Sequence, residues 1–253
     1  MTVTKVKRDA GNRPELRRNG FTFKQFFVAH DRCAMKVGTD GVLLGAWAPV
    51  GNVSRALDIG SGSGLIALML AQRSHGLIAI DAVELEPDAA SQARENAQSS
   101  PWADRISVFA QDISEFAQQH PQAYDLIVSN PPYFESAVAC RDEARNTARY
   151  TQTLTHDTLL RCAQDLLADA GMFCVVLPYA IGENFESNAH ASGWFTAIRV
   201  NIRDRDDKPL HRMLLALSRQ KIEPEIQALS IRKSEGSYSE EFCKLIGDFY
   251  LFY

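Results

Sequence analysis

A glycine-rich turn after a short apolar run near residue 57 is the first feature of this sequence that could do chemistry. Its candidate residues are Asp58, Gly60, Ser61, Gly62 and Gly64. Glycines at such a turn let the backbone approach a ligand closely, and a helix that begins there offers N–H groups. The dinucleotide fingerprint GxGxxG does not fit, because Leu65 stands where the third glycine would be, and the phosphate loop GxxxxGK(S/T) is absent. Asp58 would repel a pyrophosphate but can accept hydrogen bonds from an ammonium group. The turn therefore favours a cationic ligand without phosphates, although such turns also serve purely structural roles.

Two acids extend this pattern at the ends of the next two predicted strands. Glu84 ends the strand predicted over 77–85, and Asp112 follows the strand predicted over 106–110. A carboxylate at the first position can bind both hydroxyls of a ribose, and one at the second can accept a hydrogen bond from an exocyclic amine. Either acid alone could be an ordinary surface residue. At successive strand ends, in register with Asp58, they predict one ligand site.

A second motif, Asn130-Pro131-Pro132-Tyr133, directly follows a strand predicted over 126–128. As structure alone, it is a rigid turn out of a strand. As chemistry, the side-chain oxygen of Asn130 and the carbonyl of Pro131 can each accept one N–H of a planar amino group, which is a poor nucleophile. The two prolines would hold these acceptors rigidly, which is electrostatic preorganisation, and the ring of Tyr133 could stack on a base. None of the histidines has metal-ligand spacing, so we expect no metal.

The elements that must position these motifs alternate between strands and helices from residue 55 onward. Uniformly apolar strands separated by helices indicate a parallel sheet covered on both faces. The predicted strands are 56–59, 77–85, 106–110, 126–128 and 172–177, and the predicted helices are 65–71, 86–98 and 155–168, the last capped by Thr155 and ended by Gly171. Runs 195–202 and 213–217 predict an antiparallel hairpin at the sheet edge. In a sheet of order 3-2-1-4-5 the first and fourth strands are neighbours, so both motifs would face one crevice.

Together these motifs resemble class I S-adenosylmethionine-dependent methyltransferases over about residues 55–220. The resemblance implies an α/β fold with a Rossmann-like doubly wound sheet, mostly parallel with an antiparallel C-terminal hairpin, and S-adenosylmethionine as the cofactor. It implies that Asp58 and the glycine turn serve the methionine end of the cofactor, Glu84 the ribose and Asp112 the adenine. The tetrapeptide at 130–133 is similar to the fourth motif of amino-methyltransferases that act on planar nitrogen.

Three residues before the first core strand, Lys36, Thr39 and Asp40, could close over the cofactor. The alternative is a helix N-cap at Thr39 or Asp40 and a solvated lysine.

The flanking segments 21–47 and 238–251 are similar to a bacterial family of tRNA adenine-N6 methyltransferases, so the resemblance covers nearly the whole chain. It implies methylation of the exocyclic N6 of the adenine beside the anticodon of a valine tRNA. Such a base is already unpaired, so presenting it costs less than flipping a base out of a duplex. Three alternatives stay open: a glutamine-amide protein methyltransferase of the release-factor type, a guanine-N2 RNA methyltransferase, and a noncatalytic RNA-binding module on the same fold. The short basic arm argues against the first, and the intact tetrapeptide argues against the last.

Charge is distributed unevenly along the chain, whose formal net charge is −4. Residues 1–36 carry a net charge of +6 and residues 199–221 one of +4, so the remainder carries −14. Such asymmetry can mark a nucleic-acid-binding face, although a basic tail and an ordinary solvated face would look the same. The predicted phosphate contacts are Lys5, Lys7, Arg8, Arg13, Arg17, Arg18, Arg203, Arg205, Lys208 and Arg212. Phe23, Phe26 and Phe27 are expected to belong to the core rather than to stack on bases.

Composition excludes several other classes of protein. A hydrophobic content of 45% in 253 residues excludes overall disorder, and no apolar run approaches the roughly 18 residues of a membrane helix. The first residues contain no apolar segment of a signal peptide, and five cysteines without a CxxC pair indicate reduced thiols rather than a zinc ribbon.

We therefore expect a cytoplasmic protein whose partner is tRNA, with no metal, membrane or stable protein partner. The expected organisation is a flexible basic arm over 1–20 and a single methyltransferase domain over 21–253, with an N-terminal extension over 21–54.

Overall fold

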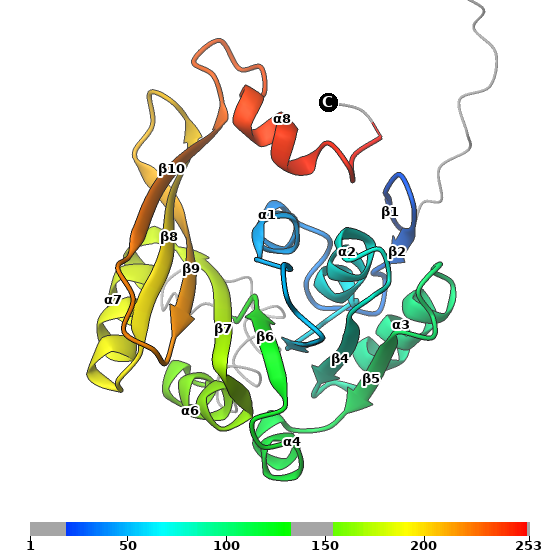
Figure 1. The fold of residues 1–253 in the computed structure, drawn as a ribbon. Coiled ribbons are helices and arrows are strands. Elements are labelled where there is room, and N and C mark those ends of the chain that lie inside the picture. Colours follow the sequence, from blue (N-terminus) through cyan, green and yellow to red (C-terminus); the bar gives the residue numbers. More distant parts are fainter. Residues whose placement is uncertain (1–18, 133–153, 252–253) are drawn as a thin grey trace, which may run out of the picture.

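An eight-stranded sheet forms the centre of the computed structural model, which describes residues 19–132 and 154–251 (Figure 1). The strand order is β10-β8-β9-β7-β6-β3-β4-β5. These strands are β3 (Arg55–Ile59), β4 (Ala79–Glu84), β5 (Ile106–Ala110), β6 (Tyr124–Ser129), β7 (Leu167–Pro178), β8 (Phe195–Arg205), β9 (Leu210–Ser218) and β10 (Glu225–Arg232). Only β9 runs against the others, since it pairs antiparallel with both β7 and β8. The mostly parallel α/β sheet with an antiparallel hairpin is confirmed.

The five strands from β5 to β7 have the expected order 3-2-1-4-5. The first and fourth strands of that order, β3 and β6, are direct neighbours, with Ile59 opposite Ser129 in the register. The glycine turn after β3 and the Asn130 turn after β6 therefore leave the sheet side by side at its carboxyl edge.

Helices cover both faces of the sheet (Figure 1). One face carries α1 (Thr39–Trp47), α2 (Leu65–Arg73), α3 (Pro87–Gln98) and α8 (Glu240–Ile246), and the other carries α4 (Ile113–Gln119), α6 (His156–Leu166) and α7 (Tyr179–Ala191). Successive residues of a strand point to opposite faces. In β6, Leu126 and Val128 accordingly join the first core, and Ile127 joins the second. This double burial explains why the strand is apolar at three successive positions, Leu126 to Val128.

The first part of the N-terminal extension packs on α3 and on the residues that follow α8. It contains a small antiparallel pair, β1 (Gly20–Thr22) and β2 (Phe27–Ala29). Asn96 of α3 bonds both the N–H and the carbonyl of Ala29, at 3.0 and 2.8 Å. Phe23 and Phe26 are buried as expected, whereas Phe27 is half-buried.

Two details of the predicted elements are wrong. The helix that Thr155 caps ends at Leu166, and Gly171 lies inside β7 instead of ending that helix. A Cβ at Gly171 would lie 2.7 Å from the Leu167 side chain, so close approach within the strand explains this glycine. The hairpin of β8 and β9 does form, but it is not at the edge, because β10 pairs parallel with β8 and is itself the edge strand.

Within residues 19–132 and 154–251, no helix is long and apolar enough to cross a membrane. In the same ranges, no three His, Cys, Asp or Glu side chains gather as a metal site.

Candidate active site

The glycine turn is fixed to the neighbouring strand by its backbone. The N–H groups of Gly60 and Ser61 both donate to the carbonyl of Val83, at 2.9 and 3.1 Å, and Gly64 N donates to Ser61 O at 2.8 Å. Gly60 has a φ of +70°, and a Cβ built on it would meet no atom within 4 Å. The turn therefore borders open space that a ligand can fill.

Asp58 is fully buried beneath this turn. Its Oδ2 accepts from the N–H of Ala67 at 3.2 Å, whereas its Oδ1 has no hydrogen-bond partner among the described residues. Burial, together with the nearby charge of Glu84, raises the pKa of Asp58 to about 7. A buried carboxylate oxygen without a partner costs free energy unless a donor reaches it. An ammonium group would satisfy it and supply the missing positive charge.

Glu84 is held in place by the backbone on both of its carboxylate oxygens. Oε2 accepts from Gly62 N at 2.8 Å and Oε1 accepts from Glu86 N at 3.0 Å, and the residue is buried. Because each carboxylate oxygen can accept more than one bond, the group can still bind the hydroxyls of a ribose.

Asp112 lies at the end of the next strand, where its Oδ1 caps α4 by accepting from Ser114 N at 2.7 Å. Together with Glu84 and Gln111 it lines a small cavity of about 30 Å³. The Nε2 of Gln111 is buried and has no partner among the described residues. This amide was missed in the sequence because a lone glutamine has no distinctive spacing. It adds a donor beside an acceptor, a combination that suits the edge of an adenine.

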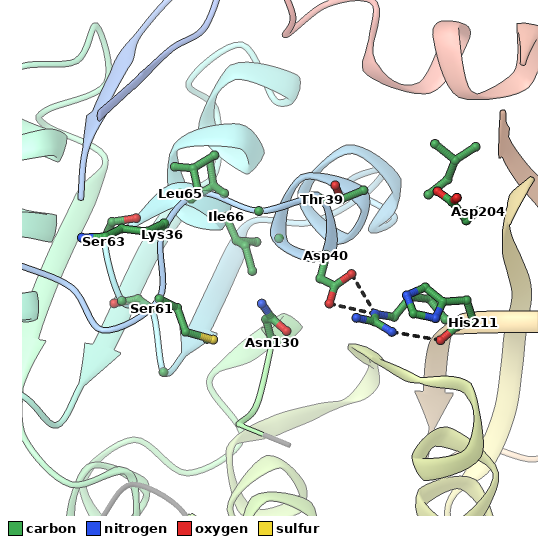
Figure 2. A pocket seen from close by; sticks show the side chains of 18 residues that line it. Lys36, Thr39, Asp40, Ser61, Ser63, Leu65, Ile66, Asn130, Asp204 and His211 are labelled. Carbon is green, nitrogen blue, oxygen red and sulfur yellow. Dashed lines mark hydrogen bonds and ion pairs between the residues drawn. The ribbon is translucent and has the colours of Figure 1, made fainter. Parts of the chain in front are cut away.

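A larger cavity of about 360 Å³ joins the glycine turn to the other predicted residues (Figure 2). Lys36, Thr39 and Asp40, the residues predicted to close over the cofactor, line it, and the side chain of Lys36 is exposed. The alternative N-cap is wrong, since Gly38 caps α1. Lys36 Nζ donates to His30 O at 2.9 Å, which fixes the segment before the helix. Further lining residues that the sequence did not indicate are Met35, Asp204, His211 and Ile231.

Asn130 lines the same cavity, opposite the glycine turn (Figure 2). Ser129 Oγ donates to Ile59 O at 2.9 Å, which fastens the end of β6 to the end of β3. Pro131 is buried and Pro132 half-buried, so the turn has little freedom. Tyr133 lies outside the described residues. The described part of the tetrapeptide therefore meets the glycine turn, as the strand order predicts.

The predicted phosphate contacts are divided between several places. Arg212 lies in the large cavity, where it pairs with Asp40. Arg203 and Arg205 are half-buried near the end of β8. The side chain of Arg205 donates to Asp207 at 2.8 Å. Lys208 is exposed at the hairpin turn. The residues Lys5, Lys7, Arg8, Arg13, Arg17 and Arg18 lie outside the described part of the chain.

These features fit S-adenosylmethionine, because its ammonium, ribose hydroxyl and adenine amino groups are hydrogen-bond donors from which the three acids at successive strand ends could accept. The unpartnered Oδ1 of Asp58 and the open space above Gly60 are the observations that support the fit. A sheet of this order with such a site defines a class I S-adenosylmethionine-dependent methyltransferase.

Comparisons with known proteins agree with this class and narrow it. The methyltransferase small domain family matches residues 42–185. The tRNA1(Val) (adenine(37)-N6)-methyltransferase of Yersinia pseudotuberculosis serotype O:3 (strain YPIII) is 64% identical over 99% of this chain and 100% of its own length. The protein with the same name in Yersinia pestis (strain Pestoides F) is 66% identical over 95% of this chain and 97% of its own length. The chain therefore belongs to the tRNA1(Val) (adenine(37)-N6)-methyltransferase family.

Solved structures show the same fold at low sequence identity. A protein of Agrobacterium tumefaciens described as a predicted O-methyltransferase superposes with a TM-score of 0.65 at 17% identity, covering 83% of this chain and 96% of that one. A glycopeptide N-methyltransferase in complex with S-adenosylmethionine gives a TM-score of 0.52 at 12% identity, covering 72% and 95%.

Proposed function

We propose that this chain transfers a methyl group from S-adenosylmethionine to N6 of adenine 37 in tRNA1(Val). The observation that carries the proposal is the presence of Asn130 and the glycine turn in one cavity, on adjacent strand ends. The names of relatives that are 64% and 66% identical over nearly the whole chain supply the particular substrate.

On the cofactor side, Asp58 Oδ1 would accept from the ammonium group, Glu84 from the ribose hydroxyls and Asp112 from the adenine amine. The glycine turn leaves room for the methionine end, and Lys36 and Thr39 would cover it from the segment before α1 and from its first turn. When bound, the cofactor supplies an electrophilic methyl group on a sulfonium, which N6 takes with loss of one proton.

On the acceptor side, Asn130 and Pro131 would fix the amino group of the base. The Asn130 side-chain oxygen and the Pro131 carbonyl each accept one N–H, which turns the nitrogen lone pair toward the methyl carbon. Because Pro131 and Pro132 restrict the backbone, these acceptors need no reorganisation during the reaction. Holding the two reactants in line supplies much of the acceleration. Tyr133 would stack on the adenine ring, a contact that contributes about 1–3 kcal/mol per base in other single-strand platforms.

Basic side chains at the carboxyl edge would bind the tRNA backbone. Arg203, Arg205, Lys208 and Arg212 lie in or beside the β8–β9 hairpin, and the basic arm would add further contacts. Such contacts position a polyanion without reading its sequence. We place the reaction in the cytoplasm, where tRNA is modified.

The proposal is tested with the purified full chain, labelled S-adenosylmethionine and two transcripts of tRNA1(Val), one with adenine and one with guanine at position 37. Nucleoside mass spectrometry should find N6-methyladenosine in the first transcript and no methylation in the second. Label that stays on protein after RNase treatment would indicate the glutamine-amide activity, and N2-methylguanosine would indicate the guanine-N2 activity. Either result would overturn the proposal.

A further inference from the structure

An ion pair between Asp40 and Arg212 joins the start of α1 to the start of β9. The Nε of Arg212 donates to both carboxylate oxygens of Asp40, at 3.0 and 2.9 Å, across 172 residues of sequence. Arg212 also donates through Nη1 to the carbonyl of His211 at 3.1 Å. These bonds help to set the orientation of the guanidinium.

The pair lies inside the large cavity rather than on the outer surface. Asp40 and Arg212 both line the space that Asn130 and the glycine turn also border. Arg212 stands opposite Pro178 in the pairing of β9 with β7, at the carboxyl edge of the sheet. Only 21% of the Arg212 side chain and 19% of the Asp40 side chain are exposed. Of the basic residues predicted to contact phosphate, Arg212 is the one in the described part of the chain that lines this cavity.

Stability alone does not account for an acid at this place. Exposed ion pairs contribute about 0–1 kcal/mol, and partly buried ones lose much of their attraction to desolvation. Helix α1 is already anchored by the buried side chains of Val42, Leu43 and Leu44. A carboxylate in a cavity that must admit RNA is also repulsive toward the phosphates. An acid that lowers the affinity for the substrate needs a compensating role, and fixing the guanidinium supplies one.

We propose that Asp40 is a positioning residue that aims the Arg212 guanidinium at a phosphodiester of the strand that carries the target adenine. A guanidinium has five N–H donors in a planar fork that matches phosphate geometry, so one arginine can serve a carboxylate and a phosphate together. Asp40, expected from the sequence to contact the cofactor, acts here on the substrate through Arg212. The inference rests on the proposed function, because it takes RNA as the substrate.

The first test is Asp40→Asn in the full chain. Without Asp40 to orient it, Arg212 should lose one charge-assisted contact to the RNA, which should lower kcat/KM for tRNA1(Val) by about tenfold, mainly through KM. Binding of fluorescent tRNA in the presence of S-adenosylhomocysteine should also weaken. The affinity for S-adenosylhomocysteine itself, measured by calorimetry, should change by less than about twofold. Simple electrostatics predicts the opposite for RNA, since removing a negative charge near a polyanion strengthens its binding.

The second test is a double-mutant cycle with Arg212→Ala. If Asp40 acts only through Arg212, then Asp40→Asn causes no further loss when Arg212 is alanine. Arg212→Lys keeps the charge but lacks the planar fork, so it should lose most of what Arg212→Ala loses. The matched control is Asp104→Asn, an exposed acid 3.8 Å from Arg105 and outside the cavity, which should leave kcat/KM unchanged.

Three results would overturn the inference. One is an unchanged or improved tRNA affinity in Asp40→Asn, and another is an additive loss in the double variant. The third is a loss of S-adenosylhomocysteine affinity in Asp40→Asn, which would make Asp40 a direct cofactor contact. A wild-type chain that binds tRNA1(Val) without methylating it would instead refute the proposed function, and the binding cycle could still be measured.

Discussion

The cofactor half of the site, built on β3, β4 and β5, differs from the acceptor half, built on β6 and the β8–β9 hairpin. In the cofactor half, the buried carboxylates of Asp58 and Glu84 are held by nearby backbone N–H groups. In the acceptor half, charged side chains are held by other charged side chains, as in the pairs Arg212–Asp40 and Arg205–Asp207.

This difference matches the two ligands. A small cofactor can be enclosed by a rigid turn of backbone, and acids that are held by backbone N–H groups can bind its ammonium and hydroxyl groups. The proposed tRNA substrate is a large polyanion, so its site is expected to be open and positively charged, with arginines that can bind a phosphate while an acid holds them in place. The two halves should therefore respond differently to substitution, pH and salt.

The largest expected effect separates catalysis from cofactor binding. Asn130→Ala removes one of two preorganised acceptors for the amino group, so the single-turnover rate of methyl transfer should fall by about 10²–10³-fold. The affinity for S-adenosylhomocysteine should stay nearly unchanged, because Asn130 belongs to the acceptor half. Asn188→Ala, at an exposed position on α7, is the control and should have wild-type rates. If the substitution at 130 weakened cofactor binding as much as the rate, Asn130 would be a structural residue.

An intermediate effect concerns pH in the cofactor half. The pKa of Asp58 is raised to about 7 without ligand, and the ammonium group prefers the ionised carboxylate. Affinity for S-adenosylhomocysteine should therefore be highest above pH 7 and fall as the pH decreases below 7, by at most about tenfold per pH unit. Calorimetry between pH 5.5 and 8 checks this. Asp58→Asn should bind more weakly at pH 8 and show little pH dependence, whereas an equally steep profile in that variant would remove Asp58 from the ammonium site.

The smallest effect concerns salt in the acceptor half. Replacing Arg203, Arg205 or Lys208 singly by glutamine should reduce the log–log salt dependence of tRNA binding by about 0.7–0.9 for each lost phosphate contact. Arg105→Gln, before β5 at the amino edge of the sheet, should leave the slope unchanged. If the three hairpin variants had the same slope as the wild-type chain and as Arg105→Gln, the hairpin would be excluded from the RNA-binding face.

The cofactor half could be predicted from sequence because its signals are local. Asp58, Glu84 and Asp112 each lie at or just beyond the end of a strand, and parallel strands bring such ends to one edge. The turn at Asn130 is equally local, and the β3–β6 neighbourhood follows from the usual strand order.

The acceptor half depends on contacts between distant residues, which sequence spacing does not reveal. Arg212 was predicted as a phosphate contact, but its place in the cavity depends on Asp40, 172 residues away. Strand β10 was missed because half of it is exposed on both faces, so its residues show no clean alternation. The end of α6 was misplaced because Leu167, which continues the helical pattern, instead pairs with Tyr124 of β6.

The most direct test of the central claim is nucleoside mass spectrometry of tRNA1(Val) from cells that lack this chain. We predict that N6-methyladenosine at position 37 is absent, that wild-type chain restores it, and that Asn130→Ala expressed at the same level does not. Persistence of the modified base in the deletion strain, or its restoration by Asn130→Ala, would contradict the account.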